Sequence, residues 1–279
     1  MYLVYPFMTR LTLFLLLSLT ALPGLKAQCF KENHAFKDGE FIAYEISYNW
    51  GPIWVDAGLV TFAIDQDTYA GKPAWHLKSS GKTYKSYDFF FKVVDYYDAW
   101  IDPATFHPYE FRRSVYEGGY KLLNTLRYER TGQIVYSSTK TNNNPVRFDT
   151  IKPAPCVYNP ILAVYVARTL DISSLKHDAR IPVTVLIDDS TYAIYIRYLG
   201  KDLVETRDGK RYKCIKFSAK MVKGTIFRGD EDVIVWVTDD DNRVPVYIEA
   251  KILVGTVKAY LKEMRGLRNP LLSLLKDSK

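Results

Sequence analysis

Hydrophobic and polar residues alternate along most of the chain. Within residues 41–50, for example, Ile42 and Tyr44 share one face of an extended chain, and Glu45 and Ser47 share the other. This period of two is typical of a β-strand that buries one face and exposes the other. Similar runs occur at residues 57–65, 74–81, 88–101, 109–116, 121–129, 133–139, 181–188, 191–200, 202–207, 211–221, 231–238, 244–254 and 256–264. The pattern predicts a mainly β protein.

Short turn sequences separate these runs, which predicts that successive strands are antiparallel neighbours. All five turns carry glycine or asparagine, and they lie at residues 70–72, 117–119, 131–132, 142–145 and 208–210. These two residue types readily adopt the left-handed backbone angles that tight hairpins need. We therefore expect antiparallel, curved sheets that form a barrel-like structure.

One helix is predicted in the middle of the chain. Asn159 suits the N-cap and Pro160 suits the first helical position, and the run I-L-A-V-Y-V-A-R-T-L follows at residues 161–170. This run is apolar almost all round, which predicts a buried helix that plugs or covers a sheet. Residues 151–178 are expected to form the linker that carries this helix.

Two similar stretches suggest that the β unit is duplicated. W-I-D-P-A-T-F-H-P begins at Trp100 and W-V-T-D-D-D-N-R-V-P begins at Trp236, and each runs through an acidic turn to a proline. A Gly-Lys turn begins 29 residues before Trp100 and 27 residues before Trp236. Two motifs in the same order at similar spacing predict two similar halves, residues 28–150 and 179–264. Trp100 and Trp236 are expected at equivalent buried positions.

The last residues, 265–279, are expected to form a tail. The sequence L-R-N-P-L-L-S-L-L-K-D-S-K at residues 267–279 favours a short amphipathic helix. We expect this segment to pack back on the barrel wall, and contact with a membrane interface is the alternative.

The N-terminus resembles a secretory leader. Arg10 precedes an apolar run at residues 11–22, Pro23 and Gly24 end it, and Ala27 offers a small residue for cleavage. The run is shorter than the roughly 20 residues that a membrane-spanning helix needs. We predict a signal peptide over residues 1–27, export to the periplasm or the outer membrane, and no transmembrane segment in the mature protein. An uncleaved anchor is the alternative interpretation.

Charge gives a weaker indication. Removal of residues 1–27 deletes Arg10 and Lys26 and no acid, so the net charge falls from +7 to +5. The excess is spread along the chain without a block of like charges, which does not indicate a nucleic-acid site. It is compatible with adsorption to lipid headgroups or acidic glycans.

Three cysteines in an exported chain raise the question of a disulfide. Cys29 lies near the mature N-terminus, Cys156 lies in the loop K-P-A-P-C-V-Y-N-P, and Cys214 lies in a strand pattern. We predict a Cys29–Cys156 disulfide, which would join the terminus to the middle of the chain. Three unpaired thiols, or a lipidated Cys29, are the alternatives.

Motifs for catalysis and metal binding are missing. The sequence contains no C-x-x-C, H-E-x-x-H, G-x-S-x-G, P-loop or G-x-G-x-x-G pattern. The acidic residues 239–241 lack the alternating ligands and closing glutamate of an EF-hand loop. Asp95 and Asp98 are three residues apart on a predicted strand, so they fall on opposite faces and do not suit a glycosidase pair. We predict no catalytic residue, metal or cofactor.

A ligand site is suggested by the aromatic run Y-K-S-Y-D-F-F-F-K-V-V-D-Y-Y-D-A-W at residues 84–100. Tyr96 and Trp100 could line a concave face, with Lys92 or Arg112 at its rim, and stack on a glycan or cover an acyl chain. Core packing is the alternative explanation of the same aromatic residues.

Three long segments resemble a known family. They are F-K-D-G-E-F-I-A-Y-E-I-S-Y-N-W-G-P-I-W-V-D-A-G, D-A-W-I-D-P-A-T-F-H-P-Y-E-F-R-R-S-V-Y-E-G-G-Y and V-W-V-T-D-D-D-N-R-V-P-V-Y-I-E-A-K-I-L-V-G-T-V-K-A-Y-L. Together they resemble the exported bacterial family called domain of unknown function 3108. The segment C-V-Y-N-P-I-L and the earlier Q-C resemble Bacteroidetes-type members.

The resemblance implies a β-rich protein of a Gram-negative cell envelope, without established catalytic residues. The general pattern is also similar to the half-barrels of periplasmic lipoprotein carriers, an analogy of fold alone. The leading hypothesis is a non-catalytic envelope protein that binds a lipid or glycan in an aromatic-lined concavity. The alternatives are a scaffold that binds an envelope protein through a sheet edge, and a hydrolase that acts on envelope material.

Overall fold

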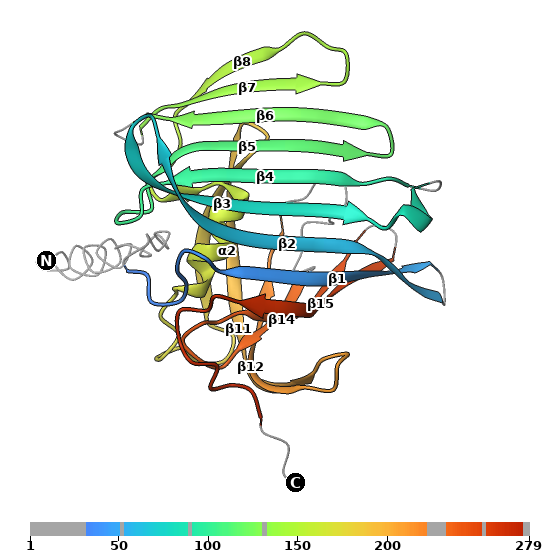
Figure 1. Ribbon diagram of the computed structural model, residues 1–279. Helices are drawn as coiled ribbons and strands as arrows, with labels where there is room; N and C mark the ends of the chain where they lie inside the picture. The colour runs from blue at the N-terminus through green and yellow to red at the C-terminus, as the bar shows by residue number, and fades with distance from the viewer. Residues whose placement is uncertain are drawn as a thin grey trace, which may run out of the picture.

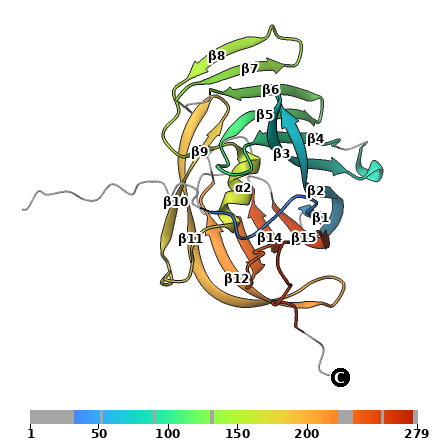
Figure 2. The same cartoon turned by 60° about the vertical axis from the view of Figure 1, so that its left-hand side comes forward.

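One large antiparallel sheet, curled around a helix, forms most of the structure (Figures 1 and 2). The computed structural model describes residues 32–50, 53–88, 91–129, 133–221, 233–252 and 255–275. The predicted leader and Cys29 lie outside these residues, so both stay predictions. The mainly β, barrel-like fold is confirmed.

The sheet contains 15 strands. Their bounds are β1 (Phe41–Trp50), β2 (Ile53–Tyr69), β3 (Lys72–Thr83), β4 (Val94–Ile101), β5 (Pro108–Glu117), β6 (Tyr120–Tyr128), β7 (Val135–Thr141), β8 (Arg147–Ile151), β9 (Val157–Tyr158), β10 (Arg180–Ile187), β11 (Ser190–Glu205), β12 (Arg211–Ala219), β13 (Val233–Thr238), β14 (Pro245–Lys251) and β15 (Thr256–Arg265). The helix α2 (Pro160–Arg168) lies between β9 and β10, and a short 3-10 turn, η1 (Lys85–Tyr87), precedes β4.

Strands that follow each other in the sequence pair with each other, except β8 and β9, which lie at the two ends of the sheet, and the first and last strands pair in its middle. The order is β8-β7-β6-β5-β4-β3-β2-β1-β15-β14-β13-β12-β11-β10-β9. We call β1–β8 the N-terminal arm and β10–β15 the C-terminal arm. They are joined by the antiparallel pairing of β1 with β15, while β9 pairs with β10 in parallel.

The helix α2 fills one end of the concave side. The Asn159 side chain accepts a hydrogen bond from the Leu162 N–H at 3.0 Å, and Pro160 begins the helix, as predicted. Leu162 and Tyr165 are at most 1% exposed and belong to a core cluster with strand residues of both arms. The cluster includes Ile64, Leu77, Ala99, Ile101, Phe111 and Leu126 from the N-terminal arm, and Val183, Val185 and Leu186 from the C-terminal arm.

A buried ion pair holds the end of this helix. Arg168 is 4% exposed, and its guanidinium donates to both carboxylate oxygens of Glu40, which is 1% exposed. It also donates to the backbone carbonyl of Asn242 at 2.9 and 3.0 Å. The arginine therefore connects the helix with the start of β1 and with the turn that precedes β14.

The two Trp motifs occupy equivalent positions in the strand pairing. Trp100 pairs with His76 on β3, and Trp236 pairs with Lys216 on β12. A β-bulge directly follows each tryptophan, and the next residue then pairs with a proline, Pro108 in the first case. In the second motif this proline is the first residue of β14. The predicted correspondence is confirmed for these strand pairs.

The expectation that both tryptophans are buried is wrong. Both side chains are partly exposed and face away from the helix. The reason lies in the alternation of the strand, because Ala99 and Ile101 on either side of Trp100 are fully buried in the cluster with α2. In β13, Val235 and Val237 take the inward positions in the same way.

Several details differ from the sequence expectations. The runs at residues 191–200 and 202–207 are one strand, β11, with an irregularity near Gly200, whose φ is 96°. The run at residues 88–101 becomes a strand only at Val94, after η1. Strands β8 and β9 were not predicted, because their sequences are short and lack a clear alternation.

The C-terminal tail forms no helix up to residue 275. Pro270 interrupts the segment, and Leu271 and Leu274 pack against a core cluster that contains Tyr212 and Cys214. The Leu275 N–H donates to the Arg211 carbonyl at 2.8 Å. The tail therefore packs back on the sheet as expected, in an extended form.

Candidate functional site

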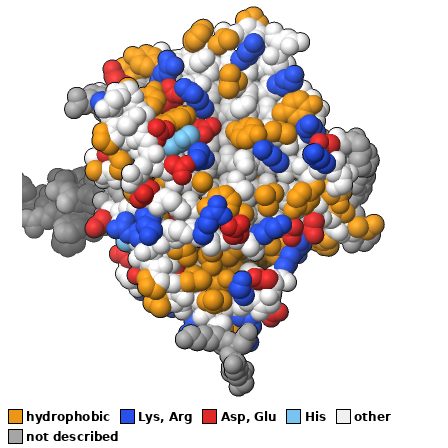
Figure 3. All heavy atoms as spheres, viewed as in Figure 1, with side chains coloured by type: hydrophobic (Ala, Val, Ile, Leu, Met, Phe, Trp, Pro, Cys, Tyr) orange, Lys and Arg blue, Asp and Glu red, His pale blue; other side chains and the backbone are white. Residues whose placement is uncertain are grey.

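The residues that the sequence singled out lie on the outer face of the sheet. Trp100 and Tyr96 alternate with the core residues of β4, and Tyr96 is 41% exposed. Figure 3 shows this outer face in the orientation of Figure 1. The prediction that these two aromatic rings line a concave face is therefore wrong, because the concave positions of β4 belong to Asp95, Tyr97, Ala99 and Ile101.

The ring of Trp100 is already in contact with its neighbours. His76 stacks on it with a centroid distance of 4.2 Å, and the Arg112 guanidinium carbon lies 5.1 Å from its centroid. Its indole N–H donates to Asp67 at 2.8 Å, which is the largest cause that lowers the pKa of Asp67. His76 in turn contacts Asp98 at 2.7 Å. These contacts give Trp100 a structural role in this corner.

The other two predicted residues, Arg112 and Lys92, lie in different places. Arg112 contacts Trp100, whereas Lys92 lies at the end of the sheet and forms an ion pair with Asp88 at 3.6 Å. Tyr96 has the ammonium group of Lys82 at 4.9 Å from its ring centroid. The structure therefore brings Trp100 and Arg112 together, and places Lys92 elsewhere.

A buried glutamate lies beneath this outer face, and no pattern in the sequence singled it out. Glu110 on β5 is 1% exposed, accepts hydrogen bonds from Tyr69 Oη at 2.8 Å and Arg127 Nε at 2.9 Å, and forms an ion pair with Arg112. Burial, and then the hydrogen bond to Glu110, raise the pKa of Tyr69. Two arginines thus surround one carboxylate.

A second polar group lies on the inner face, at the end of the sheet away from α2. Asp95 is 8% exposed and accepts a hydrogen bond from the Tyr116 N–H at 3.1 Å. Burial, followed by the charge of Glu117, raises the pKa of Asp95 to about 7. Arg113 is also 8% exposed and forms an ion pair with Asp188, while its Nε is buried without a hydrogen-bond partner among the described residues. Asp98 faces the opposite side, as the spacing predicted.

The same inner group closes the barrel-like structure. Asp188 and Asp189 form the β10–β11 turn with φ angles of 49° and 60°. Asp189 pairs with Arg147 of β8 and accepts a hydrogen bond from Ser137 of β7. The β10–β11 turn, near one end of the curled sheet, therefore contacts β7 and β8 at the other end through side chains, whereas the arms are joined at β1 and β15 by a strand pairing. In Figure 2 this turn lies beside β7 and β8.

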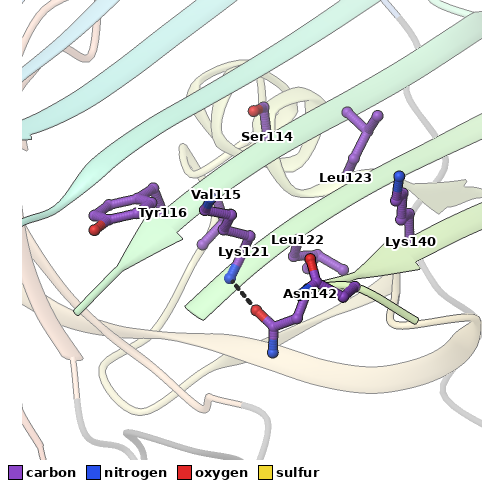
Figure 4. Close-up of a pocket in the computed structure, with 9 residues that line it drawn as sticks. Ser114, Val115, Tyr116, Lys121, Leu122, Leu123, Lys140 and Asn142 are labelled. Carbon is purple, nitrogen blue, oxygen red and sulfur yellow. Dashed lines mark hydrogen bonds between the residues drawn. The ribbon is translucent and has the colours of Figure 1, made fainter. Parts of the chain in front are cut away.

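A depression of about 480 Å³ lies at the ends of β5, β6 and β7 (Figure 4). Its lining includes Lys121, Leu123, Lys140 and Asn142, and the Lys121 N–H donates to the Asn142 side chain at 2.8 Å. Two lysines with polar and aliphatic neighbours suit an anionic group with an apolar part. The sequence patterns did not single out this place.

Metal ligands, membrane-spanning helices and cysteine thiols provide no further candidate site among the described residues. The described part of the chain contains no group of three or more His, Cys, Asp or Glu residues that could hold a metal ion. In that same part, no helix is both long and apolar enough to cross a membrane. Cys214 is a free, buried thiol, and burial raises its pKa to about 12. Cys156 lies before β9 with a φ of 59°, and its proposed partner Cys29 lies outside the described residues.

Comparisons with known proteins agree with this fold. The model of a family described as protein of unknown function, DUF3108, matches residues 43–262. A solved structure from Brucella abortus, titled a beta-barrel-like protein of domain of unknown function DUF1849, is similar with a TM-score of 0.51 and 7% identity, and the match covers 86% of this chain and 100% of that one. At such low identity the likeness shows the fold alone. Among curated proteins, none matches the chain significantly.

Proposed function

The chain belongs to the DUF3108 family, proteins of unknown function, and from that premise we propose that it is an exported envelope protein that binds a partner through its outer surface. In this proposal the protein is non-catalytic and lies in the periplasm or at the outer membrane. It does not carry a lipid or glycan inside the barrel.

The observation that supports an outer binding surface is the packing of α2 into one end of the concave side. At the helix end, Leu162 and Tyr165 are in one cluster with core residues of both arms, and every buried member of this cluster is at most 7% exposed. A carrier of an acyl chain needs an apolar cavity of several hundred Å³. The described depression lies instead at the ends of β5–β7, with lysines in its lining.

Export is supported by the leader pattern and by the cysteines. Arg10, the apolar run at residues 11–22 and Ala27 form the pattern of a cleaved signal peptide. A Cys29–Cys156 disulfide would form in an oxidising compartment, with Cys214 left as the buried thiol. Mass spectrometry of the protein from fractionated cells should find Gln28 as the first residue, and a linked Cys29–Cys156 peptide without reductant. Cytoplasmic protein that retains residues 1–27 would refute export.

Binding through the outside can be tested in the envelope itself. A photoreactive phenylalanine analogue at Leu123, which is 50% exposed on the N-terminal arm, should cross-link to an envelope component. The matched control is Leu203, 64% exposed on the C-terminal arm, where we expect far less cross-linking. Native mass spectrometry of the same protein should show no bound lipid or glycan, and a stoichiometric ligand insensitive to surface substitutions would support the carrier instead.

One observation favours a second candidate, a hydrolase that acts on envelope material. The carboxyl group of Asp95 has a pKa of about 7 beside Glu117, which would suit a general acid or base near neutral pH. Asp95→Asn separates the two proposals. An envelope phenotype or a hydrolytic activity that Asp95→Asn abolishes without loss of folding would favour the enzyme.

A further inference from the structure

The outward-facing residues of β5–β8 form a surface that we call the basic outer face. Cross-strand pairing places Arg112 opposite Thr125, Leu123 opposite Lys140 and Ser138 opposite Phe148. Residues that pair directly in neighbouring strands point to the same side of a sheet. Leu122, Leu126 and Val135 point to the other side, into the core.

Positive charge dominates this face. It carries Arg112, Arg127, Lys121 and Lys140, and all four are exposed. Among the described outward residues of these four strands, the one acid is Glu110, which is 1% exposed and paired with both arginines. The face therefore has an excess of about three positive charges at neutral pH. In Figure 3, blue and orange side chains predominate over the upper strands.

Large hydrophobic side chains stand between these cations. Phe148 is 76% exposed, Tyr136 is 51% exposed and Leu123 is 50% exposed. A single exposed hydrophobic residue is ordinary, but several on one face indicate a contact surface. Phenyl and phenol rings are also the side chains that settle at the boundary between lipid headgroups and acyl chains.

The C-terminal arm shows that such an excess of charge is not a general property of the sheet. On its outer face Lys258 pairs with Glu249, and Arg207, which follows β11, pairs across the junction of the arms with Glu45 of β1 and Asp56 of β2. Arg207 and Lys258 thus have acidic partners, whereas Lys121 of β6 and Lys140 of β7 at the depression are in no described ion pair.

We infer that the basic outer face binds the anionic headgroup surface of a lipid bilayer, and that the depression between Lys121 and Lys140 receives a headgroup phosphate. This inference rests on the proposed envelope location and outer binding surface. A bilayer offers both partners that the face requires, negative charge for the lysines and an apolar layer beneath it for Phe148 and Tyr136. Lysines act as point charges without a fixed geometry, which suits mobile headgroups.

The test is co-sedimentation of the purified, processed protein with vesicles. We expect binding to vesicles that contain phosphatidylglycerol, little binding to pure phosphatidylcholine vesicles, and release by high salt. Each lysine near an anionic membrane contributes a factor of roughly five to the partition coefficient, so the Lys121→Gln, Lys140→Gln double variant should bind about 30-fold more weakly. Phe148→Ser should weaken binding to the same vesicles without changing the salt dependence.

The matched control is the Lys213→Gln, Lys251→Gln double variant, which removes the same charge from two exposed lysines of the C-terminal arm. It should bind like the unaltered protein. Thermal unfolding of every variant checks that the fold is intact. Equal weakening by both double variants would reduce the effect to net charge and overturn the proposed face, as would the absence of binding to any vesicle.

The outcome for the proposed function is separate. If the protein does not bind any vesicle but the photoreactive analogue at Leu123 cross-links to an envelope protein, the outer surface still binds a partner, and that partner is an acidic protein. If neither vesicles nor cross-links give a signal while the protein is exported, both the lipid inference and the outer-surface proposal are wrong.

Discussion

The corners at Trp100 and Trp236 are built alike. Each indole N–H donates to an aspartate two strands away, Asp67 at 2.8 Å and Asp202 at 2.9 Å. In both cases this hydrogen bond is the largest cause that lowers the pKa of the aspartate. A residue with positive φ lies two positions before each proline, Phe106 at 58° and Arg243 at 47° in the second corner.

The two corners differ in the side chain beside the tryptophan on the next strand. In the N-terminal arm this position holds Glu110, which attracts two arginines to the outer face. In the C-terminal arm it holds Tyr247, which continues an aromatic ladder from Trp236, at 4.9 Å, to Tyr260, at 5.1 Å. The same strand–turn–strand backbone thus carries an arginine–glutamate group in one corner and stacked aromatic rings in the other. This indicates that the shared backbone stabilises the fold, while the differing side chains determine what each surface can bind.

The largest expected effect comes from Arg168, because its described contacts reach the second corner and not the first. Its guanidinium donates to the Asn242 carbonyl in that corner and pairs with Glu40. Arg168→Met would leave Glu40 buried without its partner, and we expect the free energy of unfolding to fall by about 3–5 kcal/mol in urea titrations. A second substitution, Glu40→Gln, should recover part of the loss because it removes the unpaired charge. A loss below about 1 kcal/mol would show that the pair does not anchor the helix.

The inner face of the N-terminal arm gives the next largest effect, through pH. Asp95 has a pKa of about 7, above the ordinary value for aspartate, mainly because it is buried. The folded state therefore holds this proton more tightly than the unfolded chain, so the contribution of Asp95 to stability is largest below about pH 4 and is lost as the pH rises to about 7. Asp95→Asn should raise the free energy of unfolding by about 2 kcal/mol at pH 8. This is about half of what the full pKa shift would give, because Glu117 shares the proton and solvent screens the pair.

The measurement is urea unfolding at pH 4 and pH 8. At pH 4 the Asp95→Asn variant and the unaltered protein should have similar free energies of unfolding, because in the folded state the protonated Asp95 side chain is as neutral as asparagine. A matched substitution, Asp98→Asn on the outer face, should not reproduce the gain at pH 8. If both variants behave alike, the inner position of Asp95 has no special effect on its protonation.

The equivalence of the two tryptophans predicts equal, smaller effects. Trp100→Phe and Trp236→Phe each remove the indole N–H and part of a half-buried ring, and each should lower the midpoint of thermal unfolding by about 3–5 °C. NMR titration should also show the pKa of Asp67 rising in the first variant and that of Asp202 in the second. A midpoint shift in one variant alone would mean that the corners share a sequence pattern without sharing a structural role.

Much of this architecture could be predicted from local patterns, because the alternation of hydrophobic and polar residues along a strand shows which of its faces is buried. The helix at residues 160–168 was also predictable, since Asn159 and Pro160 mark its start. The side on which Trp100 lies was not, because an aromatic ring suits either face and only Ala99 and Ile101 decide which face is inward. The pairing of Glu110 with arginines two residues and one strand away also depends on register, which the sequence alone leaves open.

The smallest effects concern single lysines, and they separate cations that support the fold from cations that are available for binding. The Lys216 ammonium lies 4.7 Å from the ring centroid of Trp236, so Lys216→Gln should cost about 0.5–1 kcal/mol in urea unfolding. Lys121 is exposed on the rim of the depression, and Lys121→Gln should stay within about 0.3 kcal/mol of the unaltered protein. Vesicle binding should show the reverse order, with Lys121→Gln weaker and Lys216→Gln unchanged. If Lys121 proves as costly to replace as Lys216, the charge on the N-terminal arm is explained by stability, and the contrast between the two outer faces loses its functional meaning.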